Sequence, residues 1–157
     1  MNLNEEVELL KGVPIFSKVE QARLKLLAFT SERVNYAAGQ ELCHQGDPGD
    51  AMYGILGGVA DVLIDTDKGQ IRVAEMRKND FIGEIAILCD VPRTATVKAK
   101  SELIALRIAK DVFFQLVQQF PQMSVELMRE LAGRLERTNQ KLQQAVGELK
   151  RLSVNPT

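Results

Sequence analysis

Residues 81–100, FIGEIAILCDVPRTATVKAK, contain the most informative pattern in this 157-residue chain. Gly83 has no Cβ, so the backbone there can adopt dihedral angles closed to other residues and can approach a ligand closely. The short apolar turn that follows can direct unpaired N–H groups at an anion, and Ala86 leaves room beside it. Arg93 carries a permanent charge in a planar fork that matches two phosphate oxygens. The stretch therefore predicts a site for a cyclic phosphodiester.

Glu84 indicates what else this ligand carries. A carboxylate repels a phosphate, unless the ligand also presents a hydroxyl that needs a strong acceptor and Arg93 neutralises the phosphate. A ribose 2′-hydroxyl meets that need, and Thr94 and Ala95 would add a hydroxyl and a backbone N–H on the phosphate side. A surface ion pair between Glu84 and Arg93 is the alternative and would contribute little. The joined pattern GE-x-A-x5-PR-x-ATV is much rarer than either dipeptide and favours the ligand site.

The segment resembles the phosphate-binding cassette of the cyclic nucleotide-binding domain family. The resemblance implies a nucleotide site in the cassette at Gly83, Glu84, Ile85, Ala86, Arg93, Thr94 and Ala95. The first four are expected to hold the ribose and phosphate, and the last three to complete the phosphate site. The turn QGDPGD, followed by MYGIL, is also typical of this family, so the resemblance extends beyond the cassette.

Composition and charge limit the classes of protein to which this chain can belong. Apolar residues make up 45% and charged residues 26% of the chain, as in ordinary globular domains. The net charge of −1 offers no basic surplus, so direct nucleic-acid binding is not expected. The acidic N-terminus and the lack of a membrane-length apolar stretch predict a cytoplasmic protein with no membrane partner. One histidine and two cysteines supply neither a metal site nor a nucleophile–base set, so we expect no enzyme and no metal.

The chain is predicted to be mainly β with flanking helices. Residues 32–108 contain short apolar runs broken by glycine, the pattern of an antiparallel β-roll of the double-sheet jelly-roll type. The predicted strands cover residues 33–36, 41–45, 51–56, 59–65, 70–76, 94–99 and 103–108. The sequence DTDKG at 65–69 predicts a hairpin turn. Two helices should precede the roll, one over 4–10 and one from a capping box at Ser17 to about Phe29.

A long helix is predicted after the roll. Residues 111–120 form a first, short helix, and Pro121 suits the first turn of a second one that reaches at least Leu152. A stripe with alternating spacings of three and four runs along this second helix at Met128, Leu131, Leu135, Thr138, Leu142, Ala145, Leu149 and Leu152. So narrow a stripe is typical of a coiled-coil seam, and a helix of about thirty residues, ~45 Å long, exceeds what so small a domain covers. We expect a parallel homodimer through residues 123–152, rather than a helix packed on its own roll.

Thr138 interrupts this seam and Asn139 follows at its edge. Buried polar groups need partners, and these two side chains offer donors and acceptors suited to the edge of a purine. In the catabolite activator protein of the same family, a dimer helix closes over the cassette and a Thr-Ser pair contacts adenine. The segment RLERTNQKL resembles that helix, which implies base contacts from Thr138 and Asn139. Fixing the register of the two helices is the alternative role.

These expectations combine into a sensor built from a nucleotide-binding roll, residues 1–120, and a helix with a short tail, residues 121–157. We expect cAMP as the ligand, with cGMP as the alternative, because threonine at the place of Thr94 is associated with guanine in the related cyclic GMP-dependent kinases. No helix-turn-helix follows Leu152, so the output should pass through another protein or a neighbouring domain. A ligand-free interaction module and an enzyme such as a phosphodiesterase are the two alternatives, and the lack of metal ligands opposes the second.

Overall fold

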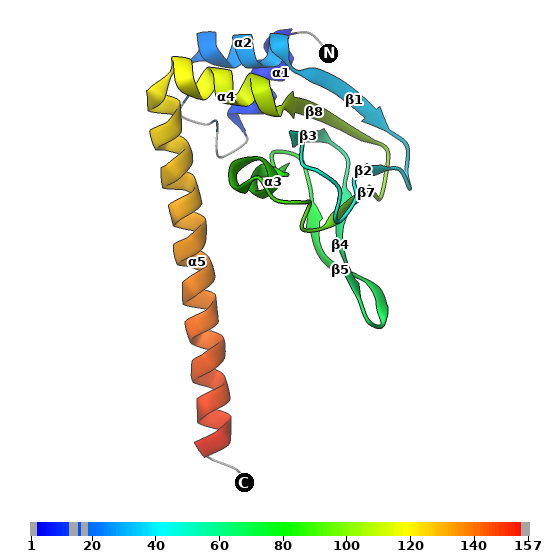
Figure 1. The fold of residues 1–157 in the computed structure, drawn as a ribbon, viewed down its shortest axis with the longest axis vertical. Helices are drawn as coiled ribbons and strands as arrows, with labels where there is room; N and C mark the ends of the chain where they lie inside the picture. The colour runs from blue at the N-terminus through cyan, green and yellow to red at the C-terminus, as the bar shows by residue number, and fades with distance from the viewer. Residues whose placement is uncertain (1–2, 13–15, 17–18, 155–157) are drawn as a thin grey trace.

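The protein folds into a β-roll with helices packed at one end and one long helix extending away from it (Figure 1). The computed structural model describes residues 3–12, 16 and 19–154, with the backbone alone at Glu5, Glu84, Ile85 and Val154. The predicted fold class, a mainly β domain with N-terminal helices and a long C-terminal helix, is confirmed.

Two four-stranded antiparallel sheets form the roll. The first sheet has the order β1 (Glu32–Tyr36), β8 (Leu103–Ala109), β3 (Ala51–Gly57) and β6 (Phe81–Ile82). The second has the order β2 (Glu41–Cys43), β7 (Thr96–Ala99), β4 (Ala60–Thr66) and β5 (Gly69–Met76). All seven predicted strands are present, although β2 and β7 are shorter than expected. The turn between β4 and β5 lies where DTDKG predicted it, with Thr66 paired to Gly69.

Strand β3 explains how the roll is held together, because both of its faces are buried. Met52 and Leu56 lie in the core beneath the helices, whereas Tyr53 and Ile55 lie in the core between the two sheets. A strand covered on both sides has no solvent face to alternate with, and its sequence AMYGIL is accordingly apolar almost throughout. The roll is therefore filled on the inside and capped by helices on the outside.

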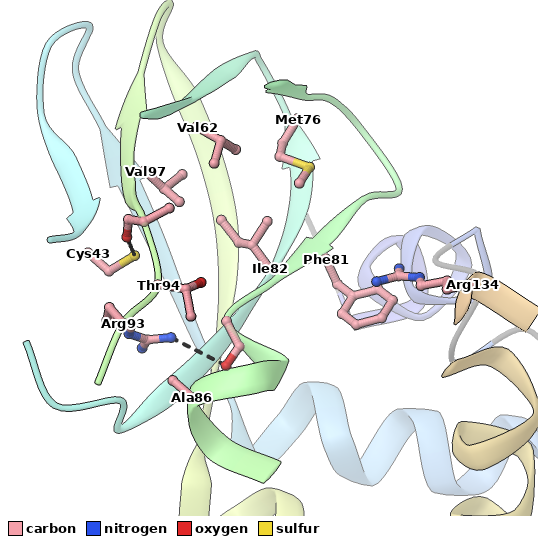
Figure 2. A pocket seen from close by; sticks show the side chains of 12 residues that line it. Cys43, Val62, Met76, Phe81, Ile82, Ala86, Arg93, Thr94, Val97 and Arg134 are labelled. Carbon is pink, nitrogen blue, oxygen red and sulfur yellow. Dashed lines mark hydrogen bonds between the residues drawn. The ribbon is translucent and has the colours of Figure 1, made fainter. Parts of the chain in front are cut away.

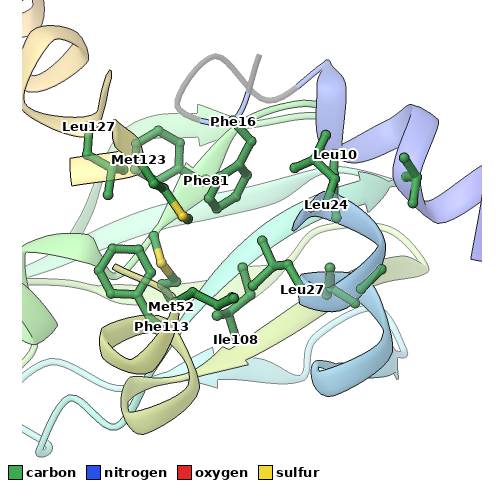
Figure 3. Packing of buried hydrophobic residues seen from close by; sticks show 14 of the residues in the cluster. Leu10, Phe16, Leu24, Leu27, Met52, Phe81, Ile108, Phe113, Met123 and Leu127 are labelled. Atoms are coloured by element: carbon green, nitrogen blue, oxygen red, sulfur yellow. The ribbon is translucent and has the colours of Figure 1, made fainter. Parts of the chain in front are cut away.

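Helices α1 (Leu3–Lys11), α2 (Gln21–Thr30) and α4 (Lys110–Gln119) cover the outer face of the first sheet (Figure 3). The predicted capping box is wrong, because α2 begins at Gln21 and its N-cap, Glu20, makes no capping hydrogen bond through its side chain. Ser17 itself lies outside the described residues. Phe16 is fully buried, and its carbonyl accepts a hydrogen bond from the Val19 N–H at 3.1 Å.

Helix α5 (Pro121–Val154) begins at the predicted proline and leaves the roll after its first turns. Met123 and Leu127 are buried in the core beneath the helices. Further along the helix, Leu135, Leu142 and Leu149 are each more than 60% exposed. The apolar seam thus projects from the isolated chain. Among the described residues, no helix is long and apolar enough to cross a membrane.

Candidate ligand-binding site

A cavity of about 170 Å³ opens between the interior of the roll and the root of α5 (Figure 2). Its lining consists of Cys43, Val62, Met76, Phe81, Ile82, Gly83, Ala86, Arg93, Thr94, Ala95, Val97 and Arg134. Five of the predicted site residues are in this set. The cavity therefore brings together both ends of the cassette, which the sequence separates by ten positions.

Gly83 connects β6 to helix α3 (Glu84–Cys89), a segment that we expected to be a short apolar turn. Its φ of 92° lies in the left-handed region, where a side chain would be strained. A Cβ there would also lie 3.0 Å from the carbonyl oxygen of Ala51 and collide with the guanidinium of Arg93. Glycine is thus required both by the backbone turn and by the close approach of Arg93.

Ala86 lies on α3 and is buried. Its methyl group lies directly against Gly49, where an added Cβ would collide with it. Two small residues facing one another allow the turn before β3 to approach α3 closely. The small size predicted for Ala86 is therefore needed for packing as well as for space at the cavity wall.

Arg93 provides the charge at one end of the cavity although its side chain is only 3% exposed. Its guanidinium donates hydrogen bonds to the carbonyl oxygens of Ala51 at 2.5 Å and Gly83 at 3.3 Å. Among the described carboxylates, the nearest is that of the exposed Asp50, which is 3.7 Å away and also pairs with Arg107 at 3.1 Å. Neutral carbonyls compensate a buried cation less well than an anion does. This end of the cavity therefore favours an anionic ligand.

Hydrogen bonds between two turns fix the position of Arg93. Its backbone N–H donates to the carbonyl of Asp47 at 2.8 Å, and its own carbonyl accepts from the N–H of Gly46 at 2.9 Å. Next to it, the hydroxyl of the buried Thr96 accepts a hydrogen bond from the N–H of Gln45 at 2.9 Å. The QGDPGD turn thus holds the cassette from behind, which explains why both motifs occur together.

The remaining wall of the cavity is apolar. Val62, Met76, Ile82 and Val97 project into it from four different strands (Figure 2). The thiol of Cys43 also belongs to this wall, where it donates to the carbonyl of Ala95 at 3.8 Å. Burial raises the pKa of this thiol, which keeps it protonated and uncharged. The cavity thus has Arg93 at one end and Arg134 at the other, with an apolar wall between them, as suits an amphipathic ligand.

The other predicted site residues lie elsewhere or are only partly described. The side chains of Glu84 and Ile85 lie outside the described part of the structure. Thr138 and Asn139 are exposed on α5 and do not line this cavity within one chain. Asn139 instead lines a shallow groove along α5 with Leu135 and Gln143.

Arg134 is the charged residue of the cavity that the sequence did not predict, because it lies on the long helix and outside the cassette motif. Its guanidinium stacks over the ring of Phe81, 4.1 Å from the ring centroid. Its Nε lies 3.9 Å from a carboxylate oxygen of Glu130, one turn earlier on α5. Arg134 precedes Thr138 by one helical turn, so both residues lie on the same side of α5. The resemblance that placed Thr138 at the ligand could therefore have indicated Arg134 as well.

Among the described residues, no three His, Cys, Asp or Glu side chains gather in a way that would hold a metal ion.

Residues 33–120, the whole roll and α4, match the cyclic nucleotide-binding domain family. The chain belongs to this family. It is a domain of the sensor and regulatory type, which is typically non-catalytic, and it is related to protein kinase A regulatory subunits and to catabolite activator-like regulators.

Individual relatives of this cyclic nucleotide-binding domain agree with that assignment. The cAMP-dependent protein kinase regulatory subunit of Blastocladiella emersonii is 35% identical over 109 residues, which are 69% of this chain and 27% of that subunit. The N-terminal domain of a transcriptional regulator from Streptomyces coelicolor A3(2) is 29% identical, with a TM-score of 0.73 over 84% of this chain and 95% of that one. The Thermus thermophilus catabolite activator protein shares the fold, with 22% identity and a TM-score of 0.76 over 85% of this chain and 63% of that one. The chain thus spans about a quarter of the curated subunit's length.

Proposed function

We propose that this domain binds a cyclic purine mononucleotide, cAMP or cGMP, and reports its presence without altering it. The observation that carries the proposal is the buried guanidinium of Arg93, which has neutral carbonyls as its close partners at the charged end of an apolar cavity. A cyclic phosphate would supply an anion closer to the guanidinium than the Asp50 carboxylate at 3.7 Å, and the apolar wall would receive the base. The cavity is smaller than the ~300 Å³ or more that usually encloses a ligand of this size, so the bound nucleotide would stay partly open until α5 closes over it.

Each cassette residue has a proposed part in holding the ligand. Arg93 binds two phosphate oxygens, and Thr94 and Ala95 add a hydroxyl and a backbone N–H beside them. Gly83 and Ala86 allow the backbone to approach the ligand. We further propose that Glu84, with Ile85 next to it at the start of α3, accepts a hydrogen bond from the ribose 2′-hydroxyl. Because a carboxylate bonds a hydroxyl strongly only when the ester is neutralised, Glu84 and Arg93 would act together.

The exposed seam of α5 supports a homodimer through residues 123–152. Leu135, Leu142 and Leu149 are each more than 60% exposed and recur at heptad spacing. In such a dimer Thr138 and Asn139 would contact the base from the partner's helix, which fits their position outside the cavity of their own chain. Nucleotide binding would then shift α5 between two settings, since a ligand stabilises the setting that it binds more tightly.

The output of this switch is proposed to be a contact with another protein or a neighbouring domain. One relative is by name a kinase regulatory subunit, and another is the N-terminal domain of a transcriptional regulator. The first name describes a subunit that regulates a kinase, and the second describes one domain of a larger regulator. The net charge of −1 gives no basic surplus of the kind that draws a protein onto nucleic acid.

Calorimetric titration with cAMP, cGMP and the linear 5′-monophosphates tests the proposal. We expect saturable binding of at least one cyclic nucleotide and much weaker binding of the linear forms, whose doubly charged phosphate needs more than one guanidinium. Recovery of the cyclic nucleotide unchanged after long incubation would separate a sensor from a phosphodiesterase. The second candidate is a ligand-free dimeric interaction module, which is favoured by the two carbonyl bonds that already satisfy part of Arg93. No heat and no thermal shift with either cyclic nucleotide would support that module.

A further inference from the structure

We infer that Arg107 holds the carboxylate of Asp50 away from Arg93 and thereby keeps the buried guanidinium of Arg93 available for a phosphate. Arg107 would be a positioning residue of the site, since it does not line the cavity and would not touch the ligand. The inference rests on the proposed function, because it assumes that the phosphate of a cyclic nucleotide binds Arg93. It concerns two charged residues that neither line the cavity nor belong to the cassette.

Asp50 is shared unequally between two guanidinium groups. Its Oδ2 accepts a hydrogen bond from Nη2 of Arg107 at 3.1 Å, whereas its Oδ1 lies 3.7 Å from Nη2 of Arg93. The first distance is that of a hydrogen bond, and the second is too long for one. The carboxylate is therefore bound to Arg107 in this structure, although a small side-chain movement would bring it onto Arg93.

Strand pairing fixes the position of Arg107. On β8 it lies directly opposite Tyr53 of β3 on one side and Glu32 of β1 on the other. The guanidinium of Arg93 lies 5.8 Å from the centroid of the Tyr53 ring, so the same tyrosine neighbours both arginines. Of the two carboxylates that pair with Arg107, Asp50 is the closer, since that of Glu32 is 4.0 Å away. Arg107 is therefore placed to bind Asp50 from the side away from the cassette.

The backbone of Asp50 is held in place, whereas its side chain is open to solvent. Its carbonyl accepts a hydrogen bond from the N–H of Lys110 at 2.9 Å, and its side chain is 72% exposed. Exposed side chains change rotamer rapidly. The next residue, Ala51, presents the carbonyl to which Arg93 donates. A carboxylate released by Arg107 would therefore meet Arg93 next to this carbonyl.

A carboxylate on Arg93 would compete with a phosphate for the same donors. The side chain of Arg93 is only 3% exposed, and salt screens a buried ion pair less than one at the surface. Binding a cyclic nucleotide would then require this pair to break, and the phosphate would be repelled by the displaced carboxylate. Arg107 reduces both costs while it binds Asp50. The affinity for a cyclic nucleotide should therefore depend on Arg107 only when residue 50 is charged.

Calorimetric titration of the full chain tests this dependence, with the cyclic nucleotide that the wild type binds most tightly. Arg107→Ala should raise Kd about 3- to 30-fold, between the effect of an exposed ion pair and that of a charge-assisted hydrogen bond. Asp50→Asn should bind at least as tightly as the wild type. The double variant should bind as tightly as Asp50→Asn alone. Arg107→Lys keeps a charged donor for Asp50, so its Kd should rise less than that of the alanine variant.

Glu32→Gln is the matched control, because it removes the other carboxylate near Arg107 and leaves Asp50 in place. It should keep the wild-type Kd. Circular dichroism must show that each variant is folded, and Arg107→Met, which keeps the aliphatic length without the charge, replaces the alanine variant if that one unfolds.

Three results would overturn the inference and leave the proposed function standing. A neutral substitution of Arg107 with the wild-type Kd would show that Asp50 does not compete for Arg93. A double variant as weak as Arg107→Ala would show that Arg107 does not act through Asp50. Weaker binding by Asp50→Asn would show that this carboxylate supports the site. If the wild type binds no cyclic nucleotide, the proposed function fails and this inference with it.

Discussion

Replacing Arg93 separates its structural role from its role toward a ligand. In the free chain its guanidinium bonds the carbonyls of Ala51 and Gly83, and in the complex we propose that it bonds the phosphate. Alanine removes a charge-assisted bidentate contact, in which each bond contributes about 1.5–3 kcal/mol. If Arg93 gives up a hydrogen bond to a carbonyl when the ligand binds, that loss offsets part of the free energy gained from the phosphate contact. The expected net loss is about 2–4 kcal/mol, which raises Kd about 30- to 700-fold.

The assay is calorimetric titration of Arg93→Ala and Arg93→Lys with the cyclic nucleotide that the wild type binds. Lysine keeps the charge and loses the fork, so its Kd should rise by about tenfold or more and stay below that of alanine. Alanine leaves two carbonyls without their donor, so its free energy of unfolding should also fall by about 1–3 kcal/mol, and circular dichroism must show a folded protein first. Arg129→Ala, on the exposed side of α5, is the control. A folded Arg93→Ala variant with wild-type affinity would refute the assignment of the charged end.

Three other predictions address the backbone, the seam and the roll. Gly83→Ala should lower the free energy of unfolding by about 1–3 kcal/mol and weaken binding, because the φ of Gly83 is 92° and the new methyl group would collide with Arg93. The control Gly147→Ala, where the added methyl group on α5 meets no other atom, should stabilise the chain. Equal urea midpoints for the two variants would contradict this prediction. Leu142→Glu should turn the dimer into a monomer in sedimentation, whereas Gln144→Glu, off the seam, should not; a monomeric wild type would remove the dimer from the proposal. Burial is the main cause that raises the pKa of Tyr36 to about 12 from its ordinary value near 10. Between about pH 10 and pH 12 the unfolded chain therefore loses a proton that the folded chain keeps, so the free energy of unfolding falls as the pH rises. Urea midpoints at about pH 9 and pH 11.5 should fall less in Tyr36→Phe, and an identical fall would show that another group is responsible.

The sequence predicted those features of the fold that depend on neighbouring residues. Short apolar runs separated by glycines indicated the strands, and the residues of the turn indicated the hairpin at Gly69. Pro121 indicated where α5 begins. Strand β6 was not predicted because two residues are too few to show a periodicity. Only their pairing with β3 makes Phe81 and Ile82 a strand. The predicted capping box was wrong because α2 begins at Gln21, and a local motif alone does not determine where a helix that packs on a sheet begins.

The charged end of the candidate site was predictable for a similar reason, since Gly83 and Arg93 lie in one contiguous motif. The far end was not predictable, because Arg134 reaches the cavity only through the angle at which α5 leaves the roll. That angle is fixed by the burial of Met123 and Leu127, which are distant from the cassette in sequence. The dimer seam could be read from spacing, whereas its register against a partner depends on a second chain.

The central claim is that Arg93 neutralises a cyclic phosphate at one end of the cavity between the roll and α5. A crystal structure of the chain with its preferred cyclic nucleotide tests this most directly. We expect the phosphate oxygens within hydrogen-bonding distance of the Arg93 guanidinium, and the base along Val62 and Met76 toward Arg134. A nucleotide bound elsewhere, or bound in this cavity with its phosphate turned away from Arg93, would contradict the account.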